Sequence, residues 1–281
     1  MSKKLAIIAV SGIVIGTVLL GTAALVGGQE LRRQNFDFGD LFNDRERCGV
    51  RLANRRGSRS LDWNHGDTIG IRVPADVRYR RGQGEQVVIE GDAALLPLIE
   101  IDNNRIQMNC RMRNMGRLVI TLPGRDFRHY DLAGSVSLTL EGVDQPRLDF
   151  DIAGAVEVTA SGRVDELDLD AAGSSEGHFG ALEANVVTID LAGSSEVEVA
   201  PRERLSVDAA GSTEVTLRTE PRTIDMDIAG SGRIVHADGT VTRASGFSSR
   251  HIERDRDADP NQNRDQNSGQ NSGQNSGQNR N

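Results

Sequence analysis

Carboxylates recur at fixed spacing in the second half of this 281-residue sequence, and they are the side chains best suited to chemistry. An aspartate stands three positions before each of six glycines, and a glutamate stands three positions after four of them. The aspartates are Asp131, Asp151, Asp170, Asp190, Asp208 and Asp227, and the glutamates are Glu157, Glu176, Glu196 and Glu214. Rows of carboxylate oxygens suit Ca²⁺, which takes about six to eight oxygen ligands. The two rows are therefore a candidate calcium ladder, and we expect no other cofactor.

The same rows also have an interpretation without a ligand. Outward-facing charges discourage association between sheet edges, and aspartate side chains cap tight bends. The calcium-binding consensus GGxGxD is absent from the sequence, which favours this alternative.

A serine-hydrolase motif, G-x-S-x-G, is present at residues 173–177, which read GSSEG. The same slot reads GSSEV from Gly193 and GSTEV from Gly211, so its fifth residue is a core position that holds glycine once. The motif also requires a strand before it and a helix after it, and no helix is expected here. We therefore predict no catalytic residue and a protein that is not an enzyme.

The carboxylate rows belong to a five-residue phrase that occurs six times within residues 128–240, in forms such as DLAGS, DIAGA and DAAGS. Its first residue is Asp, its second is apolar, its third and fourth are Ala and Gly, and its fifth is small. Its glycines are Gly134, Gly154, Gly173, Gly193, Gly211 and Gly230, at intervals of 18 to 20 residues. A period this short and steady is typical of a solenoid.

Counting from each glycine in steps of two separates apolar from polar residues. Of the 36 positions within six residues of a glycine at even steps, 29 are apolar, whereas the odd positions carry mainly Asp, Glu, Ser, Thr and Ala. A period of two is typical of strands, and helical spacing could not produce it. The sequence therefore predicts an all-β parallel β-helix, with coils of about 19 residues stacked at roughly 4.8 Å around an apolar bore.

The chain resembles the auto-transporter adhesin, head GIN domain family of bacterial envelope proteins. The resemblance rests on the repeated aliphatic-Asp-x-Ala-Gly-Ser phrase and on a lead-in that runs from Val77 through VVIEGD and LVITLPG to Leu132, and it covers roughly residues 48–239. It implies a right-handed β-helix outside the cytoplasmic membrane and no established reaction.

Residues 5–26 form an uncharged apolar run that follows Lys3 and Lys4 and is long enough to cross a hydrocarbon core of about 30 Å. We expect an N-terminal transmembrane helix within a membrane anchor at residues 1–28, with a cleaved signal segment as the alternative. A juxtamembrane linker at 29–47 follows. The prediction is a single-pass protein of the bacterial inner membrane, with its C-terminal domain in the periplasm or at the cell exterior.

The remaining boundaries follow from the repeats. Residues 48–127 have irregular strand-like runs and are expected to form the N-terminal cap and first coils, 128–240 the regular repeats, and 241–281 a disordered polar tail that includes three QNSG units. The two cysteines, Cys48 and Cys110, both fall in the cap. In an oxidising compartment they could form a disulfide, and two separate buried thiols are the alternative.

Charge limits the partners. The formal net charge is −8, and residues 128–240 carry 22 acidic against 8 basic side chains. Nucleic acid is excluded, because phosphate contacts need clustered Lys and Arg. We expect a non-catalytic binding or adhesion scaffold with a glycan or protein ligand on its outer face; the oligomeric state is not specified. The alternatives are a carbohydrate-active β-helix enzyme of the polysaccharide lyase or hydrolase type, and a self-assembling structural scaffold.

Overall fold

The structure, a computed structural model, describes residues 48–64, 66–112 and 115–253, and in these ranges the chain is all-β, as predicted. One 3₁₀ turn, η2 at Leu96–Leu98, accompanies the strands. The strands are β1 Arg56–Asp62, β2 Thr68–Ile71, β3 Ala75–Arg80, β4 Gln86–Asp92, β5 Ile99–Asp102, β6 Arg105–Met108, β7 Leu118–Thr121, β8 His129–Leu217, β9 Thr223–Val235 and β10 Val241–Glu253. The predicted anchor and linker lie outside the described residues. Within the described ranges, no helix is long and apolar enough to cross a membrane.

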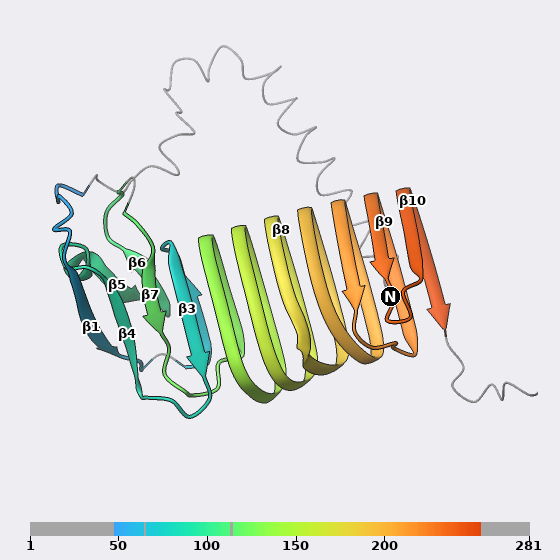
Figure 1. Cartoon of the computed structure of the whole chain (residues 1–281), viewed down its shortest axis with the longest axis horizontal. Helices are drawn as coiled ribbons and strands as arrows, with labels where there is room; N and C mark the ends of the chain where they lie inside the picture. The colour runs from blue at the N-terminus through green and yellow to red at the C-terminus, as the bar shows by residue number, and fades with distance from the viewer. Residues whose placement is uncertain (1–47, 65, 113–114, 254–281) are drawn as a thin grey trace, which may run out of the picture. The chain divides into compact units, whose positions relative to one another are not determined.

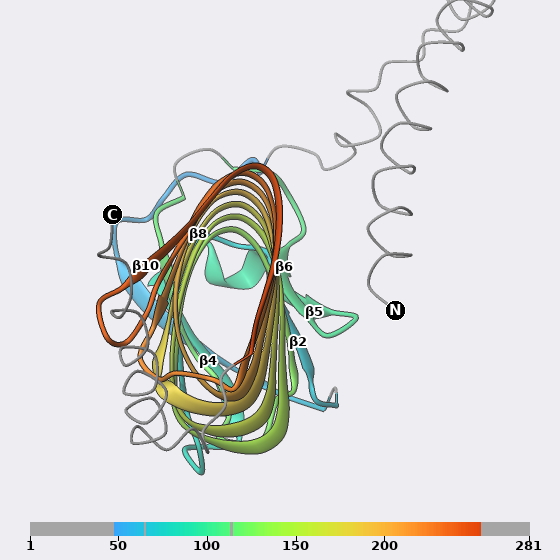
Figure 2. The same ribbon diagram turned by 90° about the vertical axis from the view of Figure 1, so that its right-hand side faces the viewer.

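β8 is one continuous 89-residue strand that winds through successive coils (Figure 1). Its last coil pairs in parallel with β9 in a register that joins Asp208 to Asp227 and Gly211 to Gly230, which is a shift of one repeat. Viewed end-on, the coils superpose as one elongated ring (Figure 2). The repeat read from the sequence is therefore one coil of the stack.

The bends stack glycine on glycine, which explains why this position admits no other residue. Gly154, Gly173, Gly193, Gly211 and Gly230 have φ between +122° and +135°, where side chains other than glycine are strained. A Cβ atom on any of these five would lie 2.1–2.5 Å from the carbonyl oxygen of the glycine one coil earlier. The close approach of successive bends therefore depends on the missing side chain.

The predicted inward positions form the core of the stack. Ile189 and Val207 are fully buried, whereas the neighbouring Thr188 is half-buried on the outside. Aromatic rings follow one another along the N-terminal part of the bore, with Tyr130 stacked on Phe150 at 5.3 Å between ring centroids and Phe150 at 5.5 Å from Phe179. Burial of these rings and of the aliphatic rows supplies the main stabilisation of the coils.

The N-terminal part is an irregular first coil with antiparallel additions. β2 and β3 lie in parallel register on the first coil of β8, pairing Ile69 with Tyr130 and Val77 with Leu138. β1, β4 and β7 form an antiparallel extension, and β5 and β6 form a hairpin. The sequence predicts strand-like runs in the cap at 68–73, 76–80, 86–90, 98–101, 105–108 and 118–122, and these match β2 to β7 to within about two residues. β1 was not predicted.

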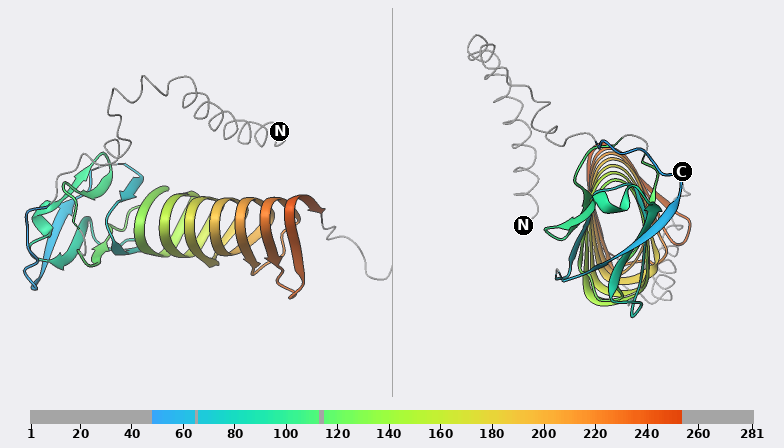
Figure 3. Two further views of the ribbon diagram at one scale, coloured as in Figure 1. Left: turned by 90° about the horizontal axis from the view of Figure 1, so that it is seen from above. Right: turned by 90° about the vertical axis from the view of Figure 1, so that its left-hand side faces the viewer.

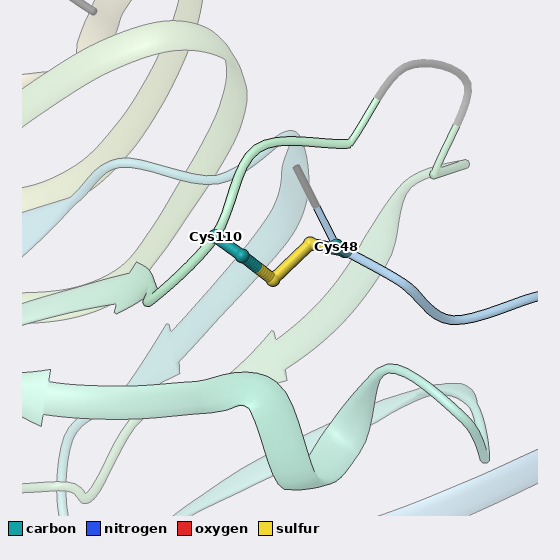
Figure 4. The surroundings of a disulfide bond; sticks show 2 residues. All are labelled: Cys48 and Cys110. Atoms are coloured by element: carbon teal, nitrogen blue, oxygen red, sulfur yellow. A yellow bond between two sulfur atoms is a disulfide. The ribbon is translucent and has the colours of Figure 1, made fainter. Parts of the chain in front are cut away.

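A disulfide closes this part of the chain (Figure 4). Cys48 and Cys110 are bonded to each other, which ties the start of the described chain to the segment after β6. The backbone amide of Cys48 also donates a hydrogen bond to the carbonyl oxygen of Arg111. Both contacts hold the first described residue of the cap against the segment that follows β6.

The C-terminal end corrects one prediction. Residues 241–253 are not part of a disordered tail, because they form β10, which runs antiparallel along the whole of β9 (Figure 3). The turn between the two strands contains Asp238 and Gly239, a pair that favours tight hairpins. Residues 254–281 lie outside the described residues.

Candidate functional site

Each coil presents two polar surfaces, one on either side of the glycine bend. We call the aspartates that precede the bend the aspartate row and the glutamates that follow it the glutamate row; their members are the residues of the predicted calcium ladder. Because coils stack in register, each row runs along the stack at about the inter-strand spacing. The structure therefore aligns each row as expected, with the two rows on opposite sides of the bend.

Crowding along the aspartate row disfavours ionisation. The pKa of Asp190 is raised to about 6, first by burial and then by the charges of Asp170 and Asp208, and the hydrogen bond that protonated Asp190 donates to Asp170 adds to the effect. The pKa of Asp208 is raised by burial and by Asp227. The centre of the row therefore holds protons more tightly than isolated carboxyl groups do.

Cations neutralise the row only toward its N-terminal end. Asp131 binds Arg72 and Arg105 at 3.1 and 3.0 Å, and Asp151 lies 3.1 Å from the Nε2 atom of His129. Asp170, Asp190, Asp208 and Asp227 form no ion pair with any described residue. In the same part of the chain, no group of three or more His, Cys, Asp or Glu side chains is arranged to hold a metal ion. Calcium binding by the ladder stays a prediction.

The glutamate row forms one side of an open groove of about 1200 Å³ that runs along the stack from β3 to β10. A serine row lies beside the glutamates, directly after the bends, and consists of Ser174, Ser194, Ser212 and Ser231. Arginines lie toward the ends of the groove, with Arg117 near β3 and Arg233 and Arg243 on β9 and β10. The groove thus repeats one hydroxyl and one carboxylate per coil over three successive coils, at Ser174 and Glu176, Ser194 and Glu196, and Ser212 and Glu214.

The glutamates of the groove differ in how far they are neutralised. Glu214 is paired with Arg233, and Glu176 lies 3.1 Å from the Nε2 atom of His178. Glu157 accepts a hydrogen bond from Ser137 at 3.3 Å. Glu196 forms no ion pair with any residue that the structure describes. The middle of the groove therefore carries the least compensated negative charge.

Two hydroxyls beneath this surface lack partners. Ser175 and Ser195 occupy the first inward position after the bend, line the groove and are each 8% exposed. Their Oγ atoms are buried without a hydrogen bond to any described residue. The Oγ atom of Ser175 is buried and has no basic partner among the described residues, so it lacks the features of an activated nucleophile.

The groove was not predicted as such from the sequence. The glutamate row was identified, but its neighbours were treated as small bend residues. The signal that could have found it is the serine that directly follows the glycine in five of the six phrases, because equivalent positions on one face of stacked strands form rows. Four of these five serines line the groove. The arginines at the ends carry no periodic signal.

These features define a class of all-β repeat proteins in which outward side chains form continuous rows along a stack of coils. The chain belongs to the family described as "Putative auto-transporter adhesin, head GIN domain", whose sequence profile matches residues 67–221. The resemblance noted in the sequence is thereby confirmed. No curated protein matches the chain.

Solved structures resemble this chain at low sequence identity. A "putative adhesin" from Bacteroides fragilis is 16% identical, with 67% of this chain and 100% of that chain covered and a TM-score of 0.53. A "putative lipid binding protein" from Parabacteroides distasonis is 16% identical, with 66% and 98% covered and a TM-score of 0.40. The first similarity shows a common fold and nothing more specific.

Proposed function

We propose that this protein is a non-catalytic, membrane-anchored β-solenoid of the cell envelope that acts as a binding or adhesion scaffold. The observation that carries the proposal is the open groove, which offers equivalent hydroxyl and carboxylate groups on successive coils. A ligand that touches several equivalent positions gains avidity, because each contact after the first is intramolecular. The name of the family, an adhesin head domain, agrees with a binding role.

The location follows from two features. Residues 5–26 are long and apolar enough for a single span, with Lys3 and Lys4 on the cytoplasmic side. The disulfide between Cys48 and Cys110 suits an oxidising compartment outside the cytoplasm. We place the coils in the periplasm or at the cell exterior and assign them a right-handed winding, the hand that parallel strand connections prefer.

The structure of the G-x-S-x-G motif, the sequence feature that suggests catalysis, supports a non-catalytic role. Ser175 completes the G-x-S-x-G pattern, but its hydroxyl is buried and the chain continues as strand on both sides. The nucleophile elbow instead exposes its serine at a turn from strand to helix.

The test compares two Ser→Trp substitutions in the full-length protein. Ser194→Trp fills the groove, whereas Ser206→Trp adds the same bulk on the other side of the bend, outside the groove. Saturable sedimentation of labelled protein with purified bacterial cell envelopes is the measurement. We expect Ser194→Trp to weaken binding at least tenfold and Ser206→Trp to leave it near wild type. Equal binding by both variants, or no saturable binding by the wild type, would contradict the proposal.

A further inference from the structure

β10 leaves one edge of the stack open. It is a 13-residue strand at the C-terminal end of the stack, and among the described strands it pairs with β9 alone (Figure 1). Beside the turn, the amide of His236 donates to the carbonyl oxygen of Thr240. The alternation of an antiparallel ladder therefore directs the backbone groups of even-numbered residues of β10 to β9 and those of odd-numbered residues to the free edge. A long open edge is a template for pairing with another chain.

The side chains of β10 also indicate a contact. The large hydrophobic side chains that are exposed in the described chain, Val241 and Phe247, both belong to β10, and Phe247 is 94% exposed. Residues 254–281 follow the strand directly, but apart from Ala258 and Pro260 they contain only polar residues and glycine. The segment that continues β10 therefore offers no large apolar side chain to cover Phe247.

The bend of β10 restricts which strand can pair with the open edge. Gly246 has a φ of +72° and lies opposite Gly230, so β10 follows β9 around the glycine bend in antiparallel register. A straight peptide could pair with only one arm of a strand that bends in this way. A second copy of β10 bends at the same glycine and could pair along both arms, as β9 already does.

From these observations we infer that the free edge of β10 pairs with β10 of a second copy of this chain, antiparallel and with the two-fold axis at Gly246. A two-fold contact uses the same surface on both molecules, which an antiparallel pair of identical strands satisfies. The register sets Ser245 opposite the partner's Phe247, Ala244 opposite the partner's Ser248, Arg243 opposite the partner's Ser249, Thr242 opposite the partner's Arg250 and Val241 opposite the partner's His251. None of these pairs sets like charges against each other, and the two N-terminal caps lie at the far ends of the doubled stack.

This register gives Phe247 an aromatic and a cationic neighbour. Its diagonal neighbours are the partner's Phe247 and the partner's Arg243, and diagonal positions about 7–8 Å apart are within reach of aromatic and long side chains. Within its own molecule Arg243 lies opposite Arg233, a like charge that Glu214 already pairs. Contact with an aromatic face of the second copy therefore favours both side chains.

Disulfide trapping with the full-length protein in detergent micelles tests the register. The two native cysteines are bonded to each other, so an introduced cysteine supplies the free thiol. A mixture of Arg243→Cys and Ser249→Cys should form a covalent dimer on mild oxidation, because opposite Cα atoms lie about 5.5 Å apart and disulfides span about 4.4–6.8 Å. Arg243→Cys alone, or mixed with Glu203→Cys at an exposed position on another coil, should form far less. Equal yields from the three samples would overturn the inference.

Sedimentation velocity over a range of protein concentrations measures the contact without a crosslink. Wild type should show a monomer–dimer equilibrium, and Phe247→Ser should raise its dissociation constant at least tenfold. Ser249→Pro removes an amide hydrogen that faces the free edge and none that binds β9, so it should abolish the dimer and leave the thermal midpoint of the monomer near wild type. A dimer that persists in both variants would be formed elsewhere, for instance by the N-terminal apolar segment, and would overturn the inference, as would a wild type that stays monomeric. The inference concerns β10 and does not depend on what the groove binds.

Discussion

Asp190→Asn should stabilise the protein at alkaline pH, although it removes a charge from the surface. The pKa of Asp190 rises from 3.8 to about 6, because the carboxyl is partly buried between Asp170 and Asp208. At about 1.4 kcal/mol per pH unit, this shift corresponds to about 3 kcal/mol of disfavoured ionisation. Asp190 is partly open to solvent, which screens the repulsion, so we reduce the expected gain to about 1 kcal/mol.

The raised pKa of Asp190 also determines how the effect of the substitution on stability changes with pH. A carboxyl whose pKa is raised by folding holds its proton more tightly in the folded state, so its contribution to stability falls as pH rises between about 4 and 6. Urea unfolding of wild type and Asp190→Asn, at about pH 8 and about pH 4, measures the free energy of unfolding in both states. The variant should exceed wild type by about 1 kcal/mol at the higher pH, and the difference should shrink toward zero at the lower.

Asp131→Asn is the matched control, since it occupies the same slot in another coil but forms ion pairs with Arg72 and Arg105. It should be neutral or destabilising by up to about 1 kcal/mol at about pH 8. A destabilised Asp190→Asn at alkaline pH, or a gain that does not change between the two pH values, would refute the claim that burial and the neighbouring carboxylates raise the pKa of Asp190.

Three further substitutions test the coil stack. Ile189→Asp buries an unpaired charge and should prevent folding, whereas Thr188→Asp on the outside should keep the β circular dichroism spectrum; equal tolerance would contradict the inward assignment. Gly193→Ala should lower the urea midpoint far more than Gly134→Ala, because both have positive φ but only Gly193 meets a carbonyl oxygen, 2.2 Å from an added Cβ. Cys48→Ser opens a crosslink that spans 62 residues and should cost about 4 kcal/mol in the chain-entropy estimate, measured as a lower thermal midpoint under oxidising conditions; an unchanged midpoint would show that the crosslink adds no stability.

The repeated coils were predictable because the bends and the core each leave a periodic signal. Gly211 and Gly230 pair directly in the structure, as the repeat required, and inward positions such as Val207 are buried. Both signals come from local geometry that recurs in every coil, so six weak observations reinforce one another.

The two ends of the stack were harder to predict from the sequence, because each end occurs once and leaves no repeated pattern. β10 was predicted as part of a tail, since its inward positions include Thr242 and Ser248 in place of aliphatic residues. A last strand has a neighbour on only one side and needs little apolar surface, which weakens the pattern that reveals a strand. β1 has the same difficulty, with Arg59 at a half-buried position where its guanidinium donates to the carbonyl oxygens of Leu96 and Ile99.

The candidate site was predicted only in part. A residue type that recurs once per repeat predicts a row of side chains along the stack, but it does not show which other side chains lie beside that row. The carboxylates were identified, whereas the groove depends on how the glutamate and serine rows adjoin in space. The raised pKa of Asp190 likewise depends on burial and on the distance between coils, which periodicity alone does not give.

The antiparallel pairing of β9 and β10 determines how the coils would respond to a pulling force. β1 and β10 lie at opposite ends of the stack, so tension between the two ends runs in the direction of the inter-strand hydrogen bonds (Figure 1). Glu253 pairs with Thr223 at the open end of the hairpin, while Val241 pairs with Val235 beside the turn. A load on Glu253 therefore breaks the β9–β10 pairs one after another, starting at Thr223. β10 would detach from β9 and extend under a weak load, while the coils that carry most of the groove stay intact.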